Sequence, residues 1–370
     1  MKAWILHNIG DIRMEETPRP KPGEGEVLIA VKAAGVCGSD IPRIYRTGAY
    51  SYPLIPGHEF SGIVREVGKG ADEAWKNKRV GVFPLVPCGK CGPCRQKAYE
   101  MCRNYSYIGS RQNGAFAQYV TAPEQNLIEL PDSVAYEEAA MLEPMAVAVH
   151  AMRRAAPQIG DAVAVCGLGA IGALLLMFLL DAGIKNIFVL GNKEIQKQAA
   201  LRMGLPEGNY CDVKMEDAGK WLKERRRDAG HTGVDVFFEC VGKNGTALQA
   251  VELAEPGGRV CLVGNPCGNM VFGKEAYWKI LRNQLTVIGT WNSSFLREKE
   301  DDWHYVLDRL ASGRIAPAGL VSHRFALEGL EEGLHIMRDK REEYVKIMAA
   351  PDGGVTPSNN AETAWKHPAF

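Results

Sequence analysis

The chain has 370 residues, which favours two domains over a single one. It is 46% hydrophobic and 24% charged with a formal net charge of zero, a balance that excludes general electrostatic attraction to nucleic acid or anionic lipid. The opening MKAWILHNIG lacks the apolar core of a signal peptide, and the longest apolar run, 173–180, is too short to cross a bilayer. We therefore expect a cytoplasmic protein with no nucleic-acid or membrane partner.

The first part of the chain, residues 1–144, has the pattern of a β domain. Runs such as EVLIAVKAAGV (26–36) and SGIVREVG (61–68) show the alternating or β-branched pattern of strands. Clusters of proline and glycine separate such runs and indicate frequent turns. Many short strands with frequent turns predict a partly closed β-barrel.

The pattern changes near residue 161. The apolar strand AVAVCGLG is followed by the helical ALLLMFLLDAG, the strand KNIFVL and the helical EIQKQAALRMG, with further strands in GVDVFFECVG and GGRVCLVGN. This alternation predicts an α/β domain with a doubly wound parallel sheet over 145–285. Residues 286–370 are mixed again, with a helix at 301–313 and a strand-like 344–349, and we assign them to the first domain. The tail from 351, rich in Pro, Gly and Asn, is expected to be loose.

Four cysteines lie within fifteen residues in the segment VPCGKCGPCRQKAYEMC. They are separated by two, two and seven residues, and their numbers are Cys88, Cys91, Cys94 and Cys102. Four thiolates can surround one tetrahedral zinc, and the glycines and proline between them allow tight turns. Disulfides conflict with the expected reducing compartment, and an iron–sulfur cluster would more often accompany further redox-centre motifs. We predict a structural zinc with no open position for substrate.

A glycine fingerprint, G-L-G-A-I-G, joins an apolar strand to an apolar helix through Gly167, Gly169 and Gly172. This context is typical of dinucleotide binding, because the glycines allow a tight turn and close approach of the pyrophosphate. The helix N-terminus then faces the phosphates.

The acidic residue expected after the second strand of such a domain is missing. The chain reads Gly191, Asn192, Lys193 at this point, which favours room and charge for a 2′-phosphate and hence NADP. In the competing interpretation Lys193 is the solvated start of the next helix and Glu194 reaches the ribose. NAD therefore remains the alternative cofactor.

A soft ligand, Cys37, and an imidazole, His58, are candidates for a second zinc site. Alone, such a pair is more often a buried thiol and a core histidine. The remaining five cysteines are interpreted as core thiols, mostly in or beside apolar strands. They are Cys166, Cys211, Cys240, Cys261 and Cys267.

Several motifs together resemble the zinc-containing medium-chain alcohol dehydrogenase family, in its polyol dehydrogenase branch. They are GVCGSD at 35–40, GHE at 57–59, the four-cysteine segment, Glu143-Pro144 and the glycine fingerprint. More narrowly, SDIPRIY (39–45), YPLIPGHEFSG (52–62), YIGSRQNGAFAQY (107–119) and LTVIGTWNSSF (285–295) look like the galactitol-1-phosphate dehydrogenases of this branch. The resemblance implies a GroES-like catalytic domain, 1–144 with 286–370, and a Rossmann cofactor domain, 145–285.

The resemblance also implies roles for particular residues. Cys37, His58 and Glu143 would hold a catalytic zinc and leave one position open, in addition to the structural zinc. Glu59 would lie behind this metal or enter its coordination, Asp40 would orient the histidine, and Ser39 would pass a proton outward. Ile41 and Pro42 stand where the family often carries a relay histidine, so the later part of the proton path is open.

The resemblance implies oxidation of a secondary alcohol of a polyol phosphate, of the galactitol 1-phosphate to tagatose 6-phosphate type, with hydride transfer to NAD(P)⁺. Arg43 and Arg46 are hypothetical phosphate ligands, unless they are solvated surface charges. The substrate could also be an unphosphorylated polyol, a vicinal diol or L-threonine, and a nucleotide-binding structural relative would have no activity. Because the metal ligands are present, the enzyme is favoured, and the family leads us to expect a homodimer or homotetramer.

Overall fold

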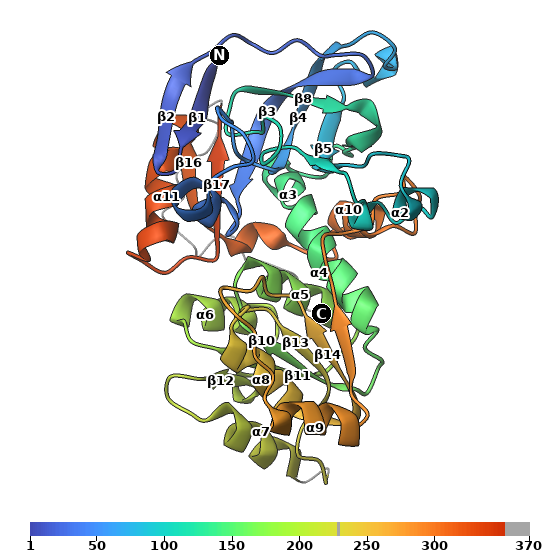
Figure 1. Cartoon of the computed structure of the whole chain (residues 1–370), viewed down its shortest axis with the longest axis vertical. Coiled ribbons are helices and arrows are strands. Elements are labelled where there is room, and N and C mark those ends of the chain that lie inside the picture. Colours follow the sequence, from blue (N-terminus) through green and yellow to red (C-terminus); the bar gives the residue numbers. More distant parts are fainter. Residues whose placement is uncertain (228–229, 352–370) are drawn as a thin grey trace. The chain divides into compact units, whose positions relative to one another are not determined.

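The computed structural model describes residues 1–227 and 230–351, so the tail expected to be loose lies, apart from its first residue, outside the described residues (Figure 1). The chain divides into two compact units. The first holds Met1–Ala146 and the described residues from Ser293 onward, and the second is Val147–Asn292. No helix in the described ranges is long and apolar enough to cross a membrane. The cytoplasmic location stays a prediction.

A seven-stranded sheet forms the centre of the first unit, in the order β16-β17-β3-β4-β5-β9, with β8 also paired to β3. Its strands are β3 (Glu26–Val36), β4 (Glu59–Val67), β5 (Arg79–Val82), β8 (Tyr119–Pro123), β9 (Leu127–Glu129), β16 (Val321–Ala326) and β17 (Lys346–Ala350). Two hairpin-like pairs accompany it, β1 (Lys2–Asn8) with β2 (Asp11–Glu16) and β6 (Leu85–Val86) with β7 (Ser106–Tyr107).

Most helices of the first unit are short, and three of them have ten or more residues. They are α1 (Asp40–Pro42), the π-helical turn η1 (Arg43–Thr47), α2 (Gly92–Arg95), α3 (Tyr136–Ala140), α10 (Asp302–Ala311) and α11 (Leu330–Asp339), and α4 (Leu142–Ala155) continues into the second unit. The helix expected at 301–313 is α10, whose N-cap Asp301 accepts a hydrogen bond from the His304 backbone N–H. Such a cap satisfies one of the free donors of the first turn.

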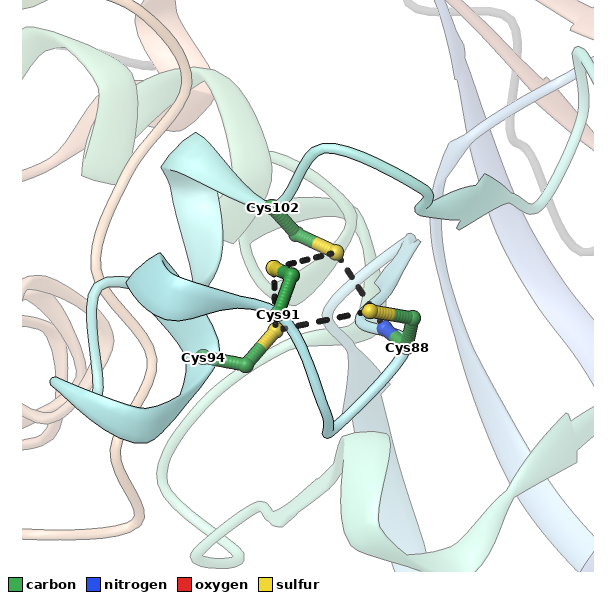
Figure 2. Close-up of side chains that lie close together, drawn as sticks. All are labelled: Cys88, Cys91, Cys94 and Cys102. Atoms are coloured by element: carbon green, nitrogen blue, oxygen red, sulfur yellow. Dashed lines mark hydrogen bonds between the residues drawn. The ribbon is translucent and has the colours of Figure 1, made fainter.

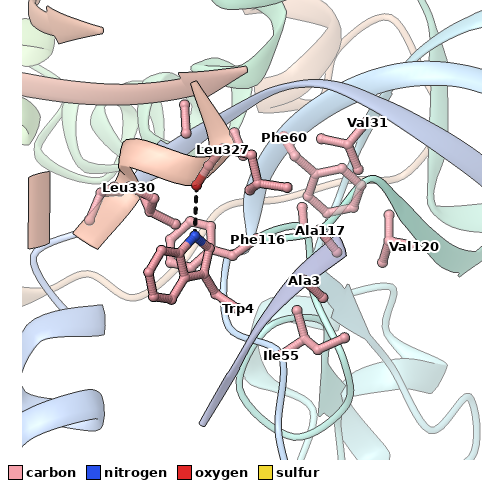
Figure 3. Packing of buried hydrophobic residues seen from close by; sticks show 14 of the residues in the cluster. Ala3, Trp4, Val31, Ile55, Phe60, Phe116, Ala117, Val120, Leu327 and Leu330 are labelled. Carbon is pink, nitrogen blue, oxygen red and sulfur yellow. Dashed lines mark hydrogen bonds between the residues drawn. The ribbon is translucent and has the colours of Figure 1, made fainter. Parts of the chain in front are cut away.

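The core of the first unit joins segments from both ends of the chain. Trp4 in β1 packs among Phe116, Leu327 and Leu330, and its indole Nε1 donates a 2.7 Å hydrogen bond to the Leu327 carbonyl (Figure 3). The bond satisfies the one polar atom of a side chain that is only 5% exposed. The contact fastens the N-terminal hairpin to a segment more than 300 residues later.

The second unit is built on a six-stranded parallel sheet in the order β12-β11-β10-β13-β14-β15. Its elements are β10 (Ala162–Cys166), α5 (Ala170–Asp181), β11 (Asn186–Gly191), α6 (Glu194–Arg202), β12 (Tyr210–Asp212), α7 (Ala218–Arg226), β13 (Val234–Glu239), α8 (Asn244–Glu252), β14 (Ala254–Leu262), α9 (Lys274–Arg282) and β15 (Thr286–Gly289). The strand order reverses between β10 and β13, which confirms the predicted doubly wound sheet.

Helices cover this sheet because its central strands are apolar on both faces. All five residues of β10 are buried, and eight of the twelve residues of α5 are buried. Helix α5 contacts α6, and α8 contacts α9, as expected when the chain winds outward in each direction from the centre of the sheet. The edge strand β15 lies beyond the boundary at residue 285 that the sequence suggested, and it belongs to this sheet because it pairs with β14.

Candidate metal centres and cofactor loop

The first candidate site forms where β3 ends and β4 begins. These strands pair antiparallel with Gly35 opposite Glu59, so Cys37, just beyond β3, comes close to His58 and Glu59. The ligand atoms of Cys37, His58 and Glu59 all lie within 4.8 Å of one another. A side chain at Gly35 would meet the Glu59 carboxylate and the end of the Lys346 side chain, so the glycine leaves room for both. We call these three residues the Cys-His-Glu group.

Asp40 lies behind His58 and is completely buried. Its Oδ1 is 3.5 Å from Nδ1 of His58 and 2.7 Å from Arg43 Nη1, and its Oδ2 accepts a hydrogen bond from the Cys37 N–H. Burial opposes ionisation of Asp40, but His58 and Arg43 hold its pKa below the usual value. Arg43, proposed from sequence for a phosphate, is thus engaged by Asp40, whereas Arg46 is exposed.

Glu59 is paired with a lysine from the far end of the chain. Lys346, the first residue of β17, directs its Nζ to the Glu59 carboxylate and donates to the Val36 carbonyl at 3.1 Å. Both side chains of the pair are at most 2% exposed. Burial lowers the pKa of a lysine, but the charge of Glu59 outweighs this and the pKa of Lys346 is raised.

Glu143 lies in the first turn of α4, 7% exposed, and outside the Cys-His-Glu group. Its Oε1 accepts a 3.0 Å hydrogen bond from the Tyr107 hydroxyl, and the Tyr107 ring stands edge-on to His58 with centroids 5.6 Å apart. Burial raises the pKa of Glu143 to about 7, while the charge of His58 opposes this and that of Glu59 adds to it. The structure therefore brings Glu59 directly to Cys37 and His58, and it places Glu143 beside them through Tyr107.

The chemistry of this site fits a metal. The imidazole of His58 is buried, and its ligand atom lies within 4.8 Å of the ligand atoms of a thiol and a carboxylate. Burial would lower the pKa of His58, but the negative charges of Asp40 and Cys37 raise it well above normal, so a cation is favoured here. Sulfur, nitrogen and oxygen donors are those that zinc takes at catalytic sites.

The second candidate site is the four-cysteine loop, whose sulfurs converge on one point (Figure 2). The sulfurs of Cys91 and Cys94 are 3.5 Å apart, those of Cys91 and Cys102 3.9 Å, and those of Cys88 and Cys94 4.0 Å. A zinc tetrahedron with ligands at about 2.3 Å has edges of about 3.8 Å, so the spacing fits. Backbone hydrogen bonds from Arg103 and Cys94 lower the pKa of Cys91 to about 6, whereas burial raises that of Cys94 to about 12.

The glycine fingerprint occupies the turn between β10 and α5. Gly167 has φ of +89°, and a side chain at Gly172 would overlap the Gly167 carbonyl oxygen, so both positions need glycine. At Gly169, the N-cap of α5, a side chain would meet no atom within 4 Å. The open space before a helix N-terminus fits a pyrophosphate.

The residues expected to select the cofactor follow β11. Gly191 is the last residue of the strand and lies against the Tyr210 hydroxyl, Asn192 is exposed, and Lys193 is the N-cap of α6. They lie at the carboxyl edge of the sheet, as the sequence suggested.

One of the five predicted core thiols, Cys267, does not lie in the core. The interpretation of Cys267 as a core thiol is wrong, because the loop that follows β14 carries this residue to the surface, where it is exposed.

Comparisons with known proteins show to which family a chain with these two units and these sites belongs. Residues 23–132 match the family described as alcohol dehydrogenase GroES-like domain, and residues 170–312 match zinc-binding dehydrogenase. The chain is 30% identical to galactitol 1-phosphate 5-dehydrogenase of Escherichia coli K12 over 336 residues, 90% of this chain and 95% of that protein. It belongs to the zinc-containing medium-chain alcohol dehydrogenase family, in its polyol dehydrogenase branch.

Further relatives of this polyol dehydrogenase are named for different substrates. Sorbitol dehydrogenase of Bacillus subtilis is 30% identical over 357 residues, 95% of this chain and 98% of that protein. The crystal structure of galactitol-1-phosphate dehydrogenase from Escherichia coli superposes with a TM-score of 0.86 at 28% identity, covering 95% of this chain and all of that one. The family, the GroES-like and Rossmann folds and the dehydrogenase activity follow from these matches.

Solved relatives differ in their bound cofactor. A putative zinc-binding dehydrogenase from Sinorhizobium meliloti is bound to NADP, with a TM-score of 0.85, 27% identity, and coverage of 95% of this chain and 99% of that one. The rspB dehydrogenase from Escherichia coli is complexed with NADH, with a TM-score of 0.84, 26% identity and the same coverage.

Two residues of the dehydrogenase site are not identified by sequence reasoning. Lys346 stands out only as part of a strand, and Tyr107 only as the start of a segment that resembles the family. No local pattern identifies them, because Lys346 meets Glu59 across 287 residues and Tyr107 meets Glu143 across 36. A lysine within the otherwise apolar strand YVKIMA is the one signal that the sequence offers.

The buried Glu59–Lys346 pair predicts a strong coupling. Lys346→Met should lower the free energy of unfolding by about 3–5 kcal/mol, because Glu59 is left buried without a counter-charge. The double variant with Glu59→Gln should lose clearly less than the sum of the two single variants. Denaturant unfolding of all four proteins, with zinc content measured in parallel, checks this. Strictly additive losses would show that the two charges do not support one another.

The raised pKa of Glu143 predicts a pH dependence of stability in chelator-treated protein. Between about pH 4.5 and pH 7 the unfolded chain has lost this proton while the folded protein keeps it, so stability should fall as the pH rises through this window. Glu143→Gln lacks the ionisation and should become more stable relative to the wild type, by roughly 1–3 kcal/mol at pH 7.5 compared with pH 5. Urea unfolding at both pH values measures the difference. A gap between the proteins that is equal at pH 5 and pH 7.5 contradicts the assignment.

Proposed function

We propose that this dehydrogenase oxidises a secondary alcohol of a polyol phosphate, of the galactitol 1-phosphate to tagatose 6-phosphate type, with hydride transfer to NAD(P)⁺. The observation that carries the proposal is the Cys-His-Glu group, with Glu143 and Ser39 beside it. The similarity to galactitol 1-phosphate 5-dehydrogenase supports the phosphorylated substrate. An unphosphorylated polyol is the second candidate, because a sorbitol dehydrogenase is equally similar in identity.

In this proposal Cys37 and His58 hold the catalytic zinc together with Glu59 or Glu143, and the four-cysteine loop holds a structural zinc. When bound, the catalytic zinc supplies a Lewis acid that makes the alcohol proton easier to remove. The Ser39 hydroxyl lies 3.3 Å from Cys37 Sγ and is half-buried, so it is placed to take that proton toward solvent. Asp40 keeps His58 in place through its charge, and its own position is held by Arg43 and the Cys37 N–H.

The cofactor part of the proposal uses the second unit. Gly167, Gly169 and Gly172 would receive the pyrophosphate at the N-terminus of α5. NAD(P)⁺ held there would supply the hydride acceptor for oxidation of the alcohol. A neutral Asn192 and a cationic Lys193 stand in place of an acid after β11, and this favours NADP over NAD.

An absorbance assay for NAD(P)H tests the function directly. We expect the zinc-loaded protein to oxidise galactitol 1-phosphate with a higher kcat/KM than galactitol, sorbitol, butanediol or L-threonine, and to prefer NADP⁺. Chelator treatment should abolish turnover, and Ser39→Ala should lower kcat by roughly 10²- to 10⁴-fold, as expected for a lost proton-transfer group. No turnover of any of these alcohols by the zinc-loaded protein would refute the function, and preference for a substrate without phosphate would refute its narrower form.

We further propose that the enzyme is a homodimer or homotetramer joined through its second unit. Strand β15 is the edge of the sheet among the described residues and carries the exposed Val287, and the neighbouring α9 exposes Tyr277, Trp278 and Leu281. An uncovered edge strand beside apolar side chains is suited to pairing with a second copy.

Sedimentation velocity at micromolar concentration tests the assembly. The wild type should sediment as a dimer or tetramer, and Val287→Lys should shift it toward a smaller species, because a charge would enter the proposed interface. Thr47→Lys, an exposed position in the first unit, is the matched control and should sediment like the wild type. A monomeric wild type would contradict the proposal.

A further inference from the structure

An arginine that the function has not used lies in a turn that packs against the segment of His58. Arg111 follows β7 in a turn whose backbone is fixed: its N–H donates to the Tyr107 carbonyl at 2.9 Å, and Gly109 and Gly114 pack directly on the backbone of Gly57. Side chains at either glycine would overlap Gly57. Because Gly57 precedes His58, the turn that carries Arg111 is built onto the segment that carries the histidine.

Two aromatic rings lie close to the Arg111 guanidinium. Its guanidinium carbon lies 4.4 Å from the ring centre of Tyr50 and 4.2 Å from that of Tyr105, and Nη1 donates to the Tyr105 carbonyl at 2.8 Å. Tyr50 is 73% exposed, so this cation reaches the surface. A guanidinium has five N–H donors, so those that do not bond to the Tyr105 carbonyl remain for a ligand.

No carboxylate lies within ion-pair distance of Arg111 in residues 1–227 and 230–351. Arg43, the sequence candidate for a phosphate ligand, differs in this respect, because Asp40 occupies it. A planar guanidinium that is already immobilised and still has its charge uncompensated binds a phosphate with little further loss of conformational entropy.

Aromatic side chains connect this arginine to the metal site. Tyr105 stands edge-on to Tyr107 with centroids 6.2 Å apart, and Tyr107 stands edge-on to His58 and donates to Glu143. Successive contacts through Tyr105 and Tyr107 therefore link the half-buried Arg111 to His58 of the Cys-His-Glu group. A substrate that follows these contacts would have its anionic end at Arg111.

We propose that Arg111, packed against Tyr50 and Tyr105, binds the phosphate of the substrate while the secondary alcohol lies at the Cys-His-Glu group. This inference rests on the proposed function and specifies its substrate class as a polyol carrying a phosphate monoester. Arg111 contributes to specificity and takes no part in the chemical step.

Steady-state kinetics on two matched substrates test the role of Arg111. Arg111→Met should lower kcat/KM for galactitol 1-phosphate by roughly 10- to 100-fold, the loss expected for charge-assisted hydrogen bonds, mainly through KM. The kcat/KM for galactitol should stay unchanged. Arg111→Lys, which keeps the charge but loses the planar fork, should lie between Arg111→Met and the wild type. Arg65→Met, at an exposed arginine on β4, is the matched control and should behave like the wild type on both substrates.

A binding measurement separates this inference from the proposed function. Calorimetric titration with inorganic phosphate should show binding to the wild type and to Arg65→Met, and weaker binding to Arg111→Met, whether or not the protein is active. An equal loss on both substrates, together with a lowered melting temperature in Arg111→Met and Arg111→Lys, would overturn the inference and indicate a brace for the turn. Turnover of galactitol 1-phosphate with unchanged kinetics in Arg111→Met would overturn the inference alone, whereas a zinc-loaded wild type with no turnover refutes the proposed function.

Discussion

The buried ion pair between Glu59 and Lys346 is the constraint on which the first unit depends. A buried carboxylate without a counter-charge is strongly unfavourable, so Glu59 can reach Cys37 and His58 only if a cation is buried with it. Lys346 is supplied by β17, which pairs with β3 on the side away from β4. The candidate metal centre and the order of strands in the sheet are therefore determined together.

Asp40, a second buried carboxylate beside His58, also has a cation paired with it. Asp40 is balanced by Arg43, as Glu59 is by Lys346, so the histidine lies between two acids that each have a cation of their own. Glu143 has no such cation among the described residues and is instead held by the Tyr107 hydroxyl. Glu143 as a ligand of a metal at this site, which the family resemblance implied, stays a prediction, because the three ligand atoms that the structure brings together come from Cys37, His58 and Glu59.

Features that depend on short stretches of chain could be predicted from the sequence. The spacing of four cysteines fixes the geometry of one loop, and the glycine fingerprint fixes one turn, so both were found from residue order alone. Contacts set by strand pairing could not be found in this way. Lys346 is aligned with Glu59 by the pairing of β17 with β3, and hydrophobic patterns locate strands without giving their partners. Arg43 illustrates the same limit, because its nearness to Cys37 in sequence suggested a phosphate ligand and only the structure shows its pairing with Asp40.

The pairing of β17 with β3 also affects the order in which the two units can fold during synthesis. A ribosome releases residues 1–146 long before Lys346, and during that interval the first unit lacks β16, β17 and the counter-charge of Glu59. The second unit is continuous in sequence and is complete once residue 292 has emerged. Its sheet can therefore form first, although it lies second in the chain, in contrast to the usual order from the N-terminus. The Trp4–Leu327 hydrogen bond likewise cannot form until Leu327 has emerged, so the packing of the N-terminal hairpin in the first unit is completed late.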